Sequence, residues 1–81
     1  MRKVTLVDFS DLLRHATSLG YDWNRAHEIM VKDEVISFYD DNCELYKSEV
    51  EGNDYGWSDD SVKIIKSFME ANNVTKFTLT R

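Results

Sequence analysis

Apolar residues recur with a helical period in the first quarter of the chain. Five of them fall at offsets of 0, 3, 4, 7 and 10, which places them on one side of a helix. These residues are Phe9, Leu12, Leu13, Ala16 and Leu19. Asp8 can cap this helix, Asp11 occupies its third position, and Gly20 can end it with a left-handed turn. The pattern therefore predicts a helix between residues 8 and 20.

Two further segments have the same kind of periodicity. Asp22 can cap a second helix and Ser58 a third, since each directly precedes an apolar stripe. The second stripe contains Trp23, Ala26, His27 and Met30. The third contains Val62, Ile65, Phe68 and Met69, with Ile64 at its edge. Two acids follow Ser58 and suit the positive end of the third helix, which Asn72-Asn73 can stop.

Four short segments rich in β-branched and aromatic residues are predicted to be strands. They cover residues 3–7, 35–39, 43–50 and 74–80. Asp40-Asp41-Asn42 has the composition of a turn, so the middle two strands are expected to form a hairpin. Residues 51–57, which include Gly52 and Gly56, are expected to form a loop.

The predicted order is β-α-α-β-β-α-β, an α+β fold in a single domain over residues 1–81. If the two early helices act as one crossover, this order is the split βαβ or ferredoxin-like arrangement, a small two-layer sandwich. The first and last strands would then lie side by side. A three-stranded sheet with helices on one face is the alternative. A folded surface of about 5,000 Å² is expected for a chain of this size.

Composition indicates a cytoplasmic protein. Cys43 is the only cysteine, so no internal disulfide can form, whereas small secreted domains usually depend on several. The first residues have only a short apolar stretch before Asp8, which fits neither a signal peptide nor a membrane-spanning helix. We expect a soluble chain without a membrane partner.

The negative charge is concentrated in the middle of the chain. Residues 40–60 contain eight carboxylates against Lys47 alone, a net charge of −7 in a protein whose formal charge is −5. The eight are Asp40, Asp41, Glu44, Glu49, Glu51, Asp54, Asp59 and Asp60. Such a block repels phosphate backbones, which argues against direct nucleic-acid binding there.

No metal or cofactor site is predicted. His15 and His27 lie twelve residues apart on separate predicted helices, and no pair of ligands has the spacing of a zinc site. The acids of residues 40–51 match several ligand positions of a calcium-binding loop. Leu45, however, stands where that loop needs glycine for its sharp turn.

Nucleophilic catalysis also lacks a motif. Gly56-Trp57-Ser58 begins like a nucleophile elbow, but Asp60 stands where the closing glycine belongs. Acidic neighbours do not activate Cys43, since they raise the pKa of a thiol. The protein is therefore predicted not to be an enzyme.

The acidic block, with its interleaved aromatic residues, is the candidate partner-binding site. Tyrosine and tryptophan are favoured interface anchors, and acids around them steer a basic partner. The predicted contact residues are Asp40, Asp41, Glu44, Tyr46, Glu49, Glu51, Asp54, Tyr55 and Trp57. Two other roles stay open: a solvated surface for the whole block, and packing against the last helix for Trp57.

The expected partner is a protein with a basic surface, such as a nucleic-acid-binding enzyme or a defence complex. In size and acidity the chain resembles, in style alone, the accessory inhibitors that phages encode, which would place it in the host cytoplasm. A nucleic-acid mimic is one version of this hypothesis, although the charge is lower than strong mimics carry. A self-associating regulatory or structural domain, as a homodimer for example, is the second hypothesis. A small-ligand binder or enzyme is the third.

Overall fold

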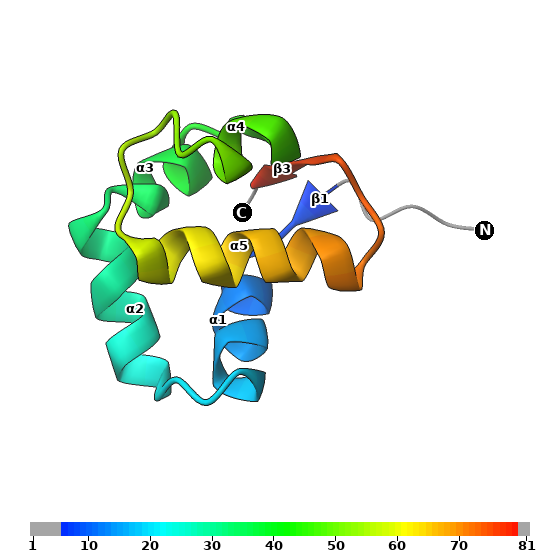
Figure 1. Ribbon diagram of the computed structural model, residues 1–81. Helices are drawn as coiled ribbons and strands as arrows, with labels where there is room; N and C mark the ends of the chain where they lie inside the picture. Colours follow the sequence, from blue (N-terminus) through cyan, green and yellow to red (C-terminus); the bar gives the residue numbers. More distant parts are fainter. Residues whose placement is uncertain (1–5, 80–81) are drawn as a thin grey trace.

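The helices and strands gather around one central helix, α5, in the computed structural model, which describes residues 6–79 (Figure 1). Their order is β1 (Leu6–Val7), α1 (Phe9–Ser18), α2 (Trp23–Lys32), α3 (Val35–Asp40), β2 (Glu44–Tyr46), α4 (Lys47–Glu51), α5 (Asp59–Ala71) and β3 (Lys76–Leu79). The described residues thus form an α+β globule with five helices and a three-stranded mixed sheet, which confirms the predicted class. None of these helices is long and apolar enough to cross a membrane.

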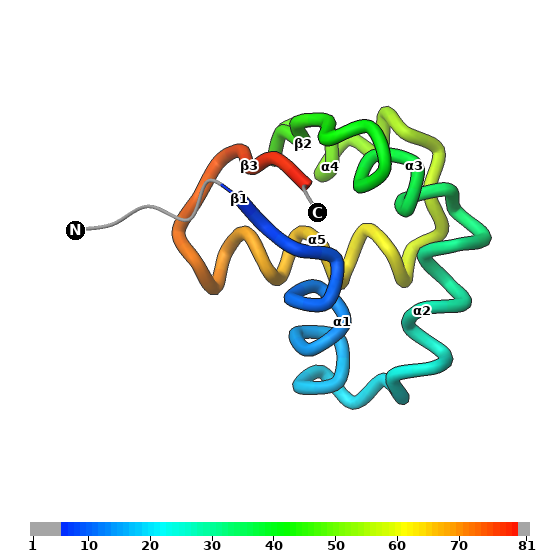
Figure 2. The backbone as a smooth tube through the Cα atoms, turned by 180° about the vertical axis from the view of Figure 1, so that it is seen from behind, coloured from blue at the N-terminus to red at the C-terminus, as the bar shows by residue number. Residues whose placement is uncertain are grey.

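The three strands pair in the order β1-β3-β2, which puts the last strand in the centre of the sheet. β1 runs parallel to β3 and β2 antiparallel to it, so Leu6 and Glu44 both lie opposite Thr78. The prediction that the first and last strands are neighbours is therefore confirmed, as the view from behind also shows (Figure 2). The parts of those strands predicted at residues 3–5 and 80 lie outside the described residues.

The core lies between the inner face of the sheet and α5. Val7, Leu45, Phe77 and Leu79 point inward from the strands and are at most 2% exposed. The Phe77 ring meets Phe68 of α5 edge to face, with ring centroids 5.6 Å apart. α5 also contacts α1, α2 and α4. The accessible surface of 5045 Å² agrees with the expected value.

The buried side of α5 differs from the predicted stripe at two positions. Ile64, expected at the edge, is fully buried, whereas Val62 is half-buried. α5 is covered on more than one side, by α1, α2 and α4 and, through the Phe68–Phe77 contact, by the sheet. The helix therefore buries a wider sector than a single stripe provides.

Residues 35–39 were predicted to be a strand, and this prediction is wrong because they form α3. Val35 and Phe38 are three residues apart and Tyr39 is one further, so a helix turns all three to one side. In the structure Val35 is fully buried, and Phe38 and Tyr39 pack against the core. A short apolar run fits both periods, and its contacts decide between them.

Residues 43–50 were predicted to be one strand, but only Glu44–Tyr46 is extended and the chain then turns into α4. Leu45 and Val50 are both fully buried. They are separated by an odd number of positions, so a regular strand would place them on opposite faces. The change from strand to helix lets both side chains reach the same core.

With these two segments as they are, the sheet does not have the predicted ferredoxin-like order. Without a strand at residues 35–39 there is no hairpin across Asp40-Asp41-Asn42, and β2 pairs with β3 instead. The sheet buries one face and leaves Leu6, Glu44 and Tyr46 exposed on the other, which is closer to the alternative three-stranded arrangement.

The predicted N-caps of the first two helices and the Gly20 turn after the first are confirmed. The Asp8 carboxylate accepts the backbone N–H of Ser10, and Asp11 returns a contact to the Asp8 N–H to complete a capping box. Asp22 caps α2 through the N–H of Asn24. After α1, Gly20 has a φ of 103°, a conformation that residues with a side chain rarely adopt.

Glu34 provides a first test of the fold because it has a φ of 63° at the junction of α2 and α3. A left-handed conformation costs a residue with a Cβ about 1–2 kcal/mol. Glycine avoids this cost, but it also gives the unfolded chain more conformational entropy, which offsets part of the gain in stability. We expect Glu34→Gly to raise the free energy of unfolding in urea by about 0.5–1 kcal/mol. Glu34→Ala removes the same charge but keeps the Cβ, and an equal gain in this control would contradict the explanation.

Candidate functional site

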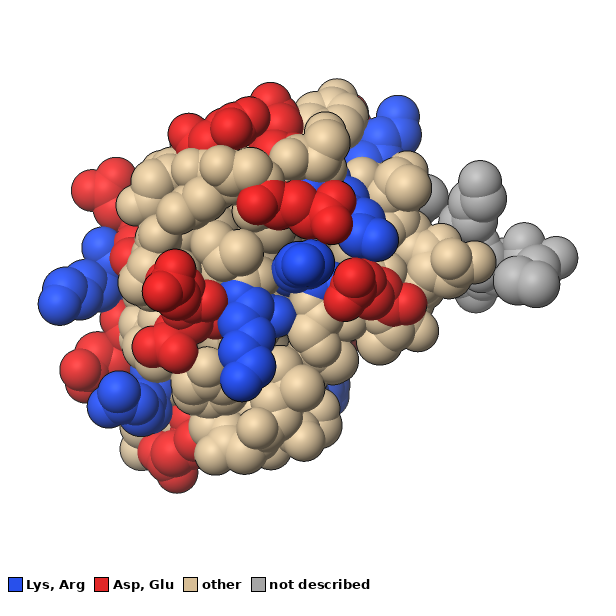
Figure 3. All heavy atoms as spheres, viewed as in Figure 1, with Lys and Arg blue, Asp and Glu red and all other residues tan. Residues whose placement is uncertain are grey.

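Two surfaces carry the candidate chemistry: an acidic surface built from α3, β2, α4 and the following loop, and a pocket between α2 and α5. We define the acidic surface as Asp40, Asp41, Glu44, Tyr46, Glu49, Glu51, Asp54 and Tyr55. Figures 1 and 2 both show α3 and α4 next to each other on the same side of the molecule. Acidic side chains gather along that side, while Lys and Arg side chains lie across the middle of the same view, over α5 (Figure 3).

Two tyrosines of the acidic surface each donate a hydrogen bond to one carboxylate, and we call these pairs the tyrosine-linked group. The Tyr46 hydroxyl donates to Glu44 Oε2 at 3.1 Å, and the Tyr55 hydroxyl donates to Glu49 Oε1 at 3.0 Å. The Asp54 backbone N–H donates to the Glu49 carbonyl at 2.9 Å. The structure therefore brings these five predicted residues together, although β2, α4 and the loop each contribute some of them.

The carboxylates also affect the ionisation of both tyrosines. The hydrogen bond to Glu44 and its negative charge raise the pKa of Tyr46 above its ordinary value. Burial and the hydrogen bond to Glu49 raise the pKa of Tyr55 to about 12, and the backbone N–H of Tyr46 opposes this shift. Both phenols consequently keep their protons, and continue to donate, throughout the physiological pH range.

The remaining acids of this surface lie at the ends of short helices. Asp40 is the last residue of α3, Asp41 follows it, and Glu51 ends α4. All three side chains are exposed. They extend the negative charge beyond the tyrosine-linked group toward α3.

Trp57, the ninth predicted contact residue, belongs to the core because only 4% of its surface is exposed. Its ring stacks on Tyr55 at 4.4 Å and meets Phe38 edge to face at 5.9 Å. The Asn53 side chain holds the Trp57 backbone through two 2.8 Å hydrogen bonds, one to the N–H and one to the carbonyl. The buried Trp57 ring thus packs against the inner side of Tyr55. Tyr46 and Tyr55 remain as the aromatic residues of the acidic surface.

A single carboxylate joins the end of α2 to the start of α5. Asp33 Oδ2 accepts the backbone N–H of Ser58 at 3.1 Å and the hydroxyls of Ser58 and Ser61 at 2.6 Å each. Ser58 does occupy the predicted N-cap position, but its hydroxyl donates to Asp33 instead of accepting an N–H of its own helix. Asp33 performs the part of a capping box that binds the N-cap N–H, from 25 residues away.

Opposing effects act on the ionisation of Asp33. Partial burial favours the neutral acid, but the hydrogen bonds from Ser58 and Ser61, helped by the charge of Lys32, outweigh it. The pKa of Asp33 is therefore below its ordinary value, and the carboxylate is the stable form at neutral pH.

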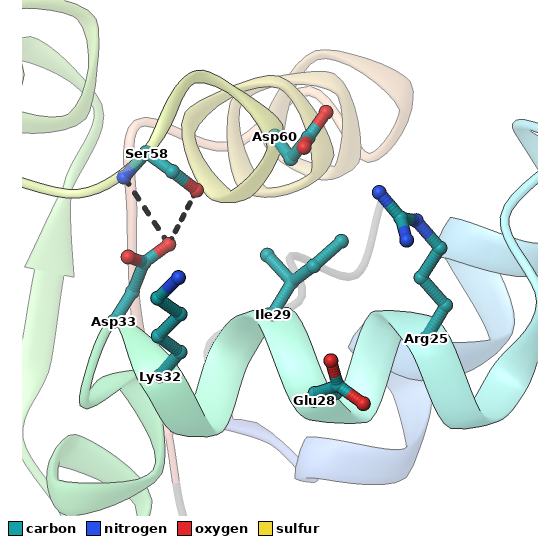
Figure 4. Close-up of a pocket in the computed structure, with 7 residues that line it drawn as sticks. All are labelled: Arg25, Glu28, Ile29, Lys32, Asp33, Ser58 and Asp60. Atoms are coloured by element: carbon teal, nitrogen blue, oxygen red, sulfur yellow. Dashed lines mark hydrogen bonds between the residues drawn. The ribbon is translucent and has the colours of Figure 1, made fainter.

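The second surface is a pocket of about 340 Å³ between α2 and the first turn of α5 (Figure 4). It is lined by Arg25, Glu28, Ile29, Lys32, Asp33, Ser58 and Asp60. One wall comes from successive turns of α2 and the other from α5. Both charge signs occur in the lining, and Ile29 is the apolar residue between them.

His15 of α1 and Ser67 of α5 form a polar contact that the sequence did not indicate. His15 Nε2 lies 2.8 Å from Ser67 Oγ, and the imidazole meets the Phe68 ring edge to face at 5.7 Å. Burial lowers the pKa of His15, which keeps the ring neutral at pH 7. The pair lies against the aromatic core, so we assign it to the packing of α1 on α5.

Neither the histidines nor Cys43 takes part in a metal-binding arrangement within residues 6–79. No group of three or more His, Cys, Asp or Glu side chains in that part of the chain is placed to hold a metal ion. Cys43 is half-buried, and its thiol makes a long contact of 3.9 Å to the Asp41 carbonyl.

Neither the role of Asp33 nor the pocket was predicted from the sequence. Arg25, Ile29 and Lys32 have the spacing of one helix face, which was available from the sequence. The opposite wall was not, because it depends on the start of α5 being next to the end of α2.

The Asp33 contacts generate a stability prediction. Asp33→Ala should lower the free energy of unfolding at pH 7 by about 2–4 kcal/mol, because the fully buried Ser61 loses its acceptor. Asp33→Asn keeps an acceptor but loses the charge, so about 1 kcal/mol is expected. Urea denaturation measures both, with the exposed Glu28→Gln as the control.

The same contacts predict how the effect depends on pH. Since the pKa of Asp33 is lowered on folding, the wild-type advantage over Asp33→Asn is complete above the ordinary value of 3.8. It should disappear as the pH falls through the folded-state pKa. An advantage that stays constant into that acidic range would contradict the assigned ionisation.

The Tyr55–Glu49 hydrogen bond can be tested with a double-mutant cycle of Tyr55→Phe and Glu49→Gln. The two substitutions should be non-additive by about 1 kcal/mol in the free energy of unfolding at pH 7, because each removes the same charge-assisted contact. Tyr21→Phe combined with Glu49→Gln is the matched control and should be additive, because the Tyr21 hydroxyl donates to Asp60 instead. Additivity in the first pair would show that the contact contributes nothing.

The molecule thus combines a tyrosine-linked acidic surface on α3, β2 and α4 with a separate pocket between α2 and α5. No protein-family model, no curated protein and no solved structure matches this chain.

Proposed function

We propose that this protein is a non-enzymatic binding domain whose acidic surface docks on a basic surface of another protein. The observation that carries the proposal is the tyrosine-linked group, in which Tyr46 is bonded to the exposed Glu44 and Tyr55 to the half-buried Glu49. An acidic surface with aromatic anchors suits a target that normally binds phosphates. The target class is a nucleic-acid-binding enzyme or a defence complex, and the protein acts on it in the cytoplasm as a small inhibitor or modulator.

Tyr46 is the aromatic side chain best placed to anchor a partner. It is 42% exposed on the outer face of β2, and its hydroxyl is held by Glu44 two residues away. An anchor that is already oriented loses less rotamer entropy when a partner binds. Tyr55 is half-buried on Trp57, so it offers a fixed edge of the same surface.

The surrounding acids act mainly on the rate of encounter. Exposed charges of one sign raise the association rate with an oppositely charged surface, and salt screens this effect. They contribute less to the stability of the final complex. A salt-sensitive association rate is therefore the expected signature of this surface.

Self-association is a second candidate function, favoured by the outer face of the sheet. Leu6 is 68% exposed on β1, and Tyr46 lies on the same face, with Glu44 and Lys76 as oppositely charged neighbours. Light scattering after size exclusion distinguishes the two: loss of a dimer with Leu6→Asp would favour this candidate.

The proposal is tested first by capturing partners of the tagged protein from a bacterial lysate at low and high salt, with identification by mass spectrometry. The captured protein is then purified and its association rate measured against a fourfold amide variant, Asp40→Asn, Asp41→Asn, Glu44→Gln and Asp54→Asn. We expect the association rate at low salt to fall about tenfold or more, and its salt dependence to weaken.

A control variant of equal net charge separates location from total charge. It carries Glu28→Gln, Glu34→Gln, Asp59→Asn and Glu70→Gln, four acids outside the acidic surface. Its association rate should remain close to that of the wild type. If the two variants change the association rate equally, or if neither changes it, the proposal that this surface steers the partner is wrong.

A further inference from the structure

The pocket between α2 and α5 contains two cations, Arg25 and Lys32, that form no direct contact with an acid of the described residues. Arg25, Ile29 and Lys32 lie in a row along α2, and their side chains extend toward α5 (Figure 4). Neither cation forms a hydrogen bond or ion pair with another described residue. Glu28, by contrast, lies on the side of α2 away from α5 in the same view. Both cations of the pocket are therefore on the wall that faces α5, where the charge of Lys32 also acts on the neighbouring Asp33 carboxylate.

The two acids on the other side of the pocket differ in what they already bind. Asp33 Oδ2 is occupied by three donors from Ser58 and Ser61. Asp60 accepts the Tyr21 hydroxyl with Oδ1 at 2.8 Å, a contact that fixes the carboxylate and raises the pKa of Tyr21. The second oxygen of Asp60, Oδ2, accepts no hydrogen bond from another described residue.

Arg25 and Asp60 come from opposite walls at one end of the pocket (Figure 4). They have opposite charges and opposite effects on the pKa of Tyr21, which Asp60 raises and Arg25 lowers, yet they form no ion pair with each other. A group with a negative and a positive end fits between them better than a simple anion, which Asp60 would repel. An α-ammonium next to an α-carboxylate is such a group.

Lys32, at the other end of the pocket, favours a ligand with a second negative group. It is seven residues from Arg25, which separates their Cα atoms by about 10 Å along the helix. Ile29 lies between the two cations and offers an apolar contact for a short methylene chain. A side chain that crosses Ile29 and ends in a carboxylate would reach Lys32.

From this arrangement we propose that the pocket binds a free α-amino acid with an acidic side chain, of the size of glutamate. The α-carboxylate contacts Arg25, the α-ammonium contacts Asp60 Oδ2, and the side-chain carboxylate contacts Lys32. The volume of about 340 Å³ accommodates a ligand of this size together with water. The inference concerns a different part of the molecule from the acidic surface and does not depend on it.

The test is an NMR titration of the ¹⁵N-labelled full chain with glutamate and three analogues, each lacking one charged group, at constant ionic strength. Glutarate lacks the ammonium, 2-aminopentanoate lacks the side-chain carboxylate, and 4-aminobutanoate lacks the α-carboxylate. Glutamate should shift the signals of the residues that line the pocket. Each analogue should bind about tenfold more weakly, because it loses one charge-assisted contact.

Three variants assign these contacts one by one. Each variant should bind glutamate only as tightly as the wild type binds the analogue that lacks the matching charged group. That analogue is 4-aminobutanoate for Arg25→Gln, glutarate for Asp60→Asn and 2-aminopentanoate for Lys32→Gln. Lys66→Gln, a cation of α5 outside the pocket lining, is the matched control and should leave the affinity unchanged. Asp60→Asn keeps an acceptor for the Tyr21 hydroxyl, so the fold should be preserved. The titration of the wild type with the analogues tests the proposal without any variant.

Two results would overturn the proposal. One is the absence of shifts at the pocket with glutamate up to about 50 mM, a concentration that saturates even millimolar sites. The other is an equal response to glutamate and all three analogues, or an equal loss in Lys66→Gln, which would indicate non-specific screening of surface charge.

Discussion

The structure depends on the burial of α5 against several elements at once. Ile64, Ile65 and Met69 are fully buried, and Phe68 meets Phe77 of the central strand. Within residues 6–79 the longest strand has 4 residues, so this sheet has too little surface to be stable alone. It forms because α5 covers its inner face. In turn α1, α2 and α4 are held by contacts with the same helix. The position of α5 consequently determines where every surface of the molecule lies.

Asp33 fixes the end of this helix where its contacts with α2 begin. Three donors from Ser58 and Ser61 converge on one oxygen, so the first turn of α5 cannot move away from α2 without leaving a carboxylate and the buried Ser61 hydroxyl without partners. The left-handed Glu34 next to it then directs the chain into α3. The junction at Asp33 and Glu34 thereby sets the width of the pocket. It also sets the direction of α3, which carries part of the acidic surface.

The two candidate surfaces use charge in different ways. On the acidic surface, Glu44 and Glu49 are each bonded to a tyrosine, and carboxylates exceed cations, which suits a large partner with a basic face. In the pocket, Arg25, Lys32 and Asp60 alternate in sign around Ile29, which suits a small ligand that carries both signs. An extended field attracts a macromolecule from a distance, whereas a few fixed charges around a cavity select a ligand by its shape.

The sequence by itself determined the features that depend on neighbours within one or two turns. The helix from Phe9, its Asp8 cap, the Gly20 turn and the concentration of acids in residues 40–60 all follow from local spacing and composition. Tertiary structure decided the rest. Residues 35–39 and 43–50 are short enough to satisfy both helical and extended periods, so the location of their apolar contacts selected α3 and the change from β2 to α4. The burial of Trp57, the contact of Asp33 with Ser58 and the pocket beside it join residues far apart in the chain, and no local pattern encodes such distances.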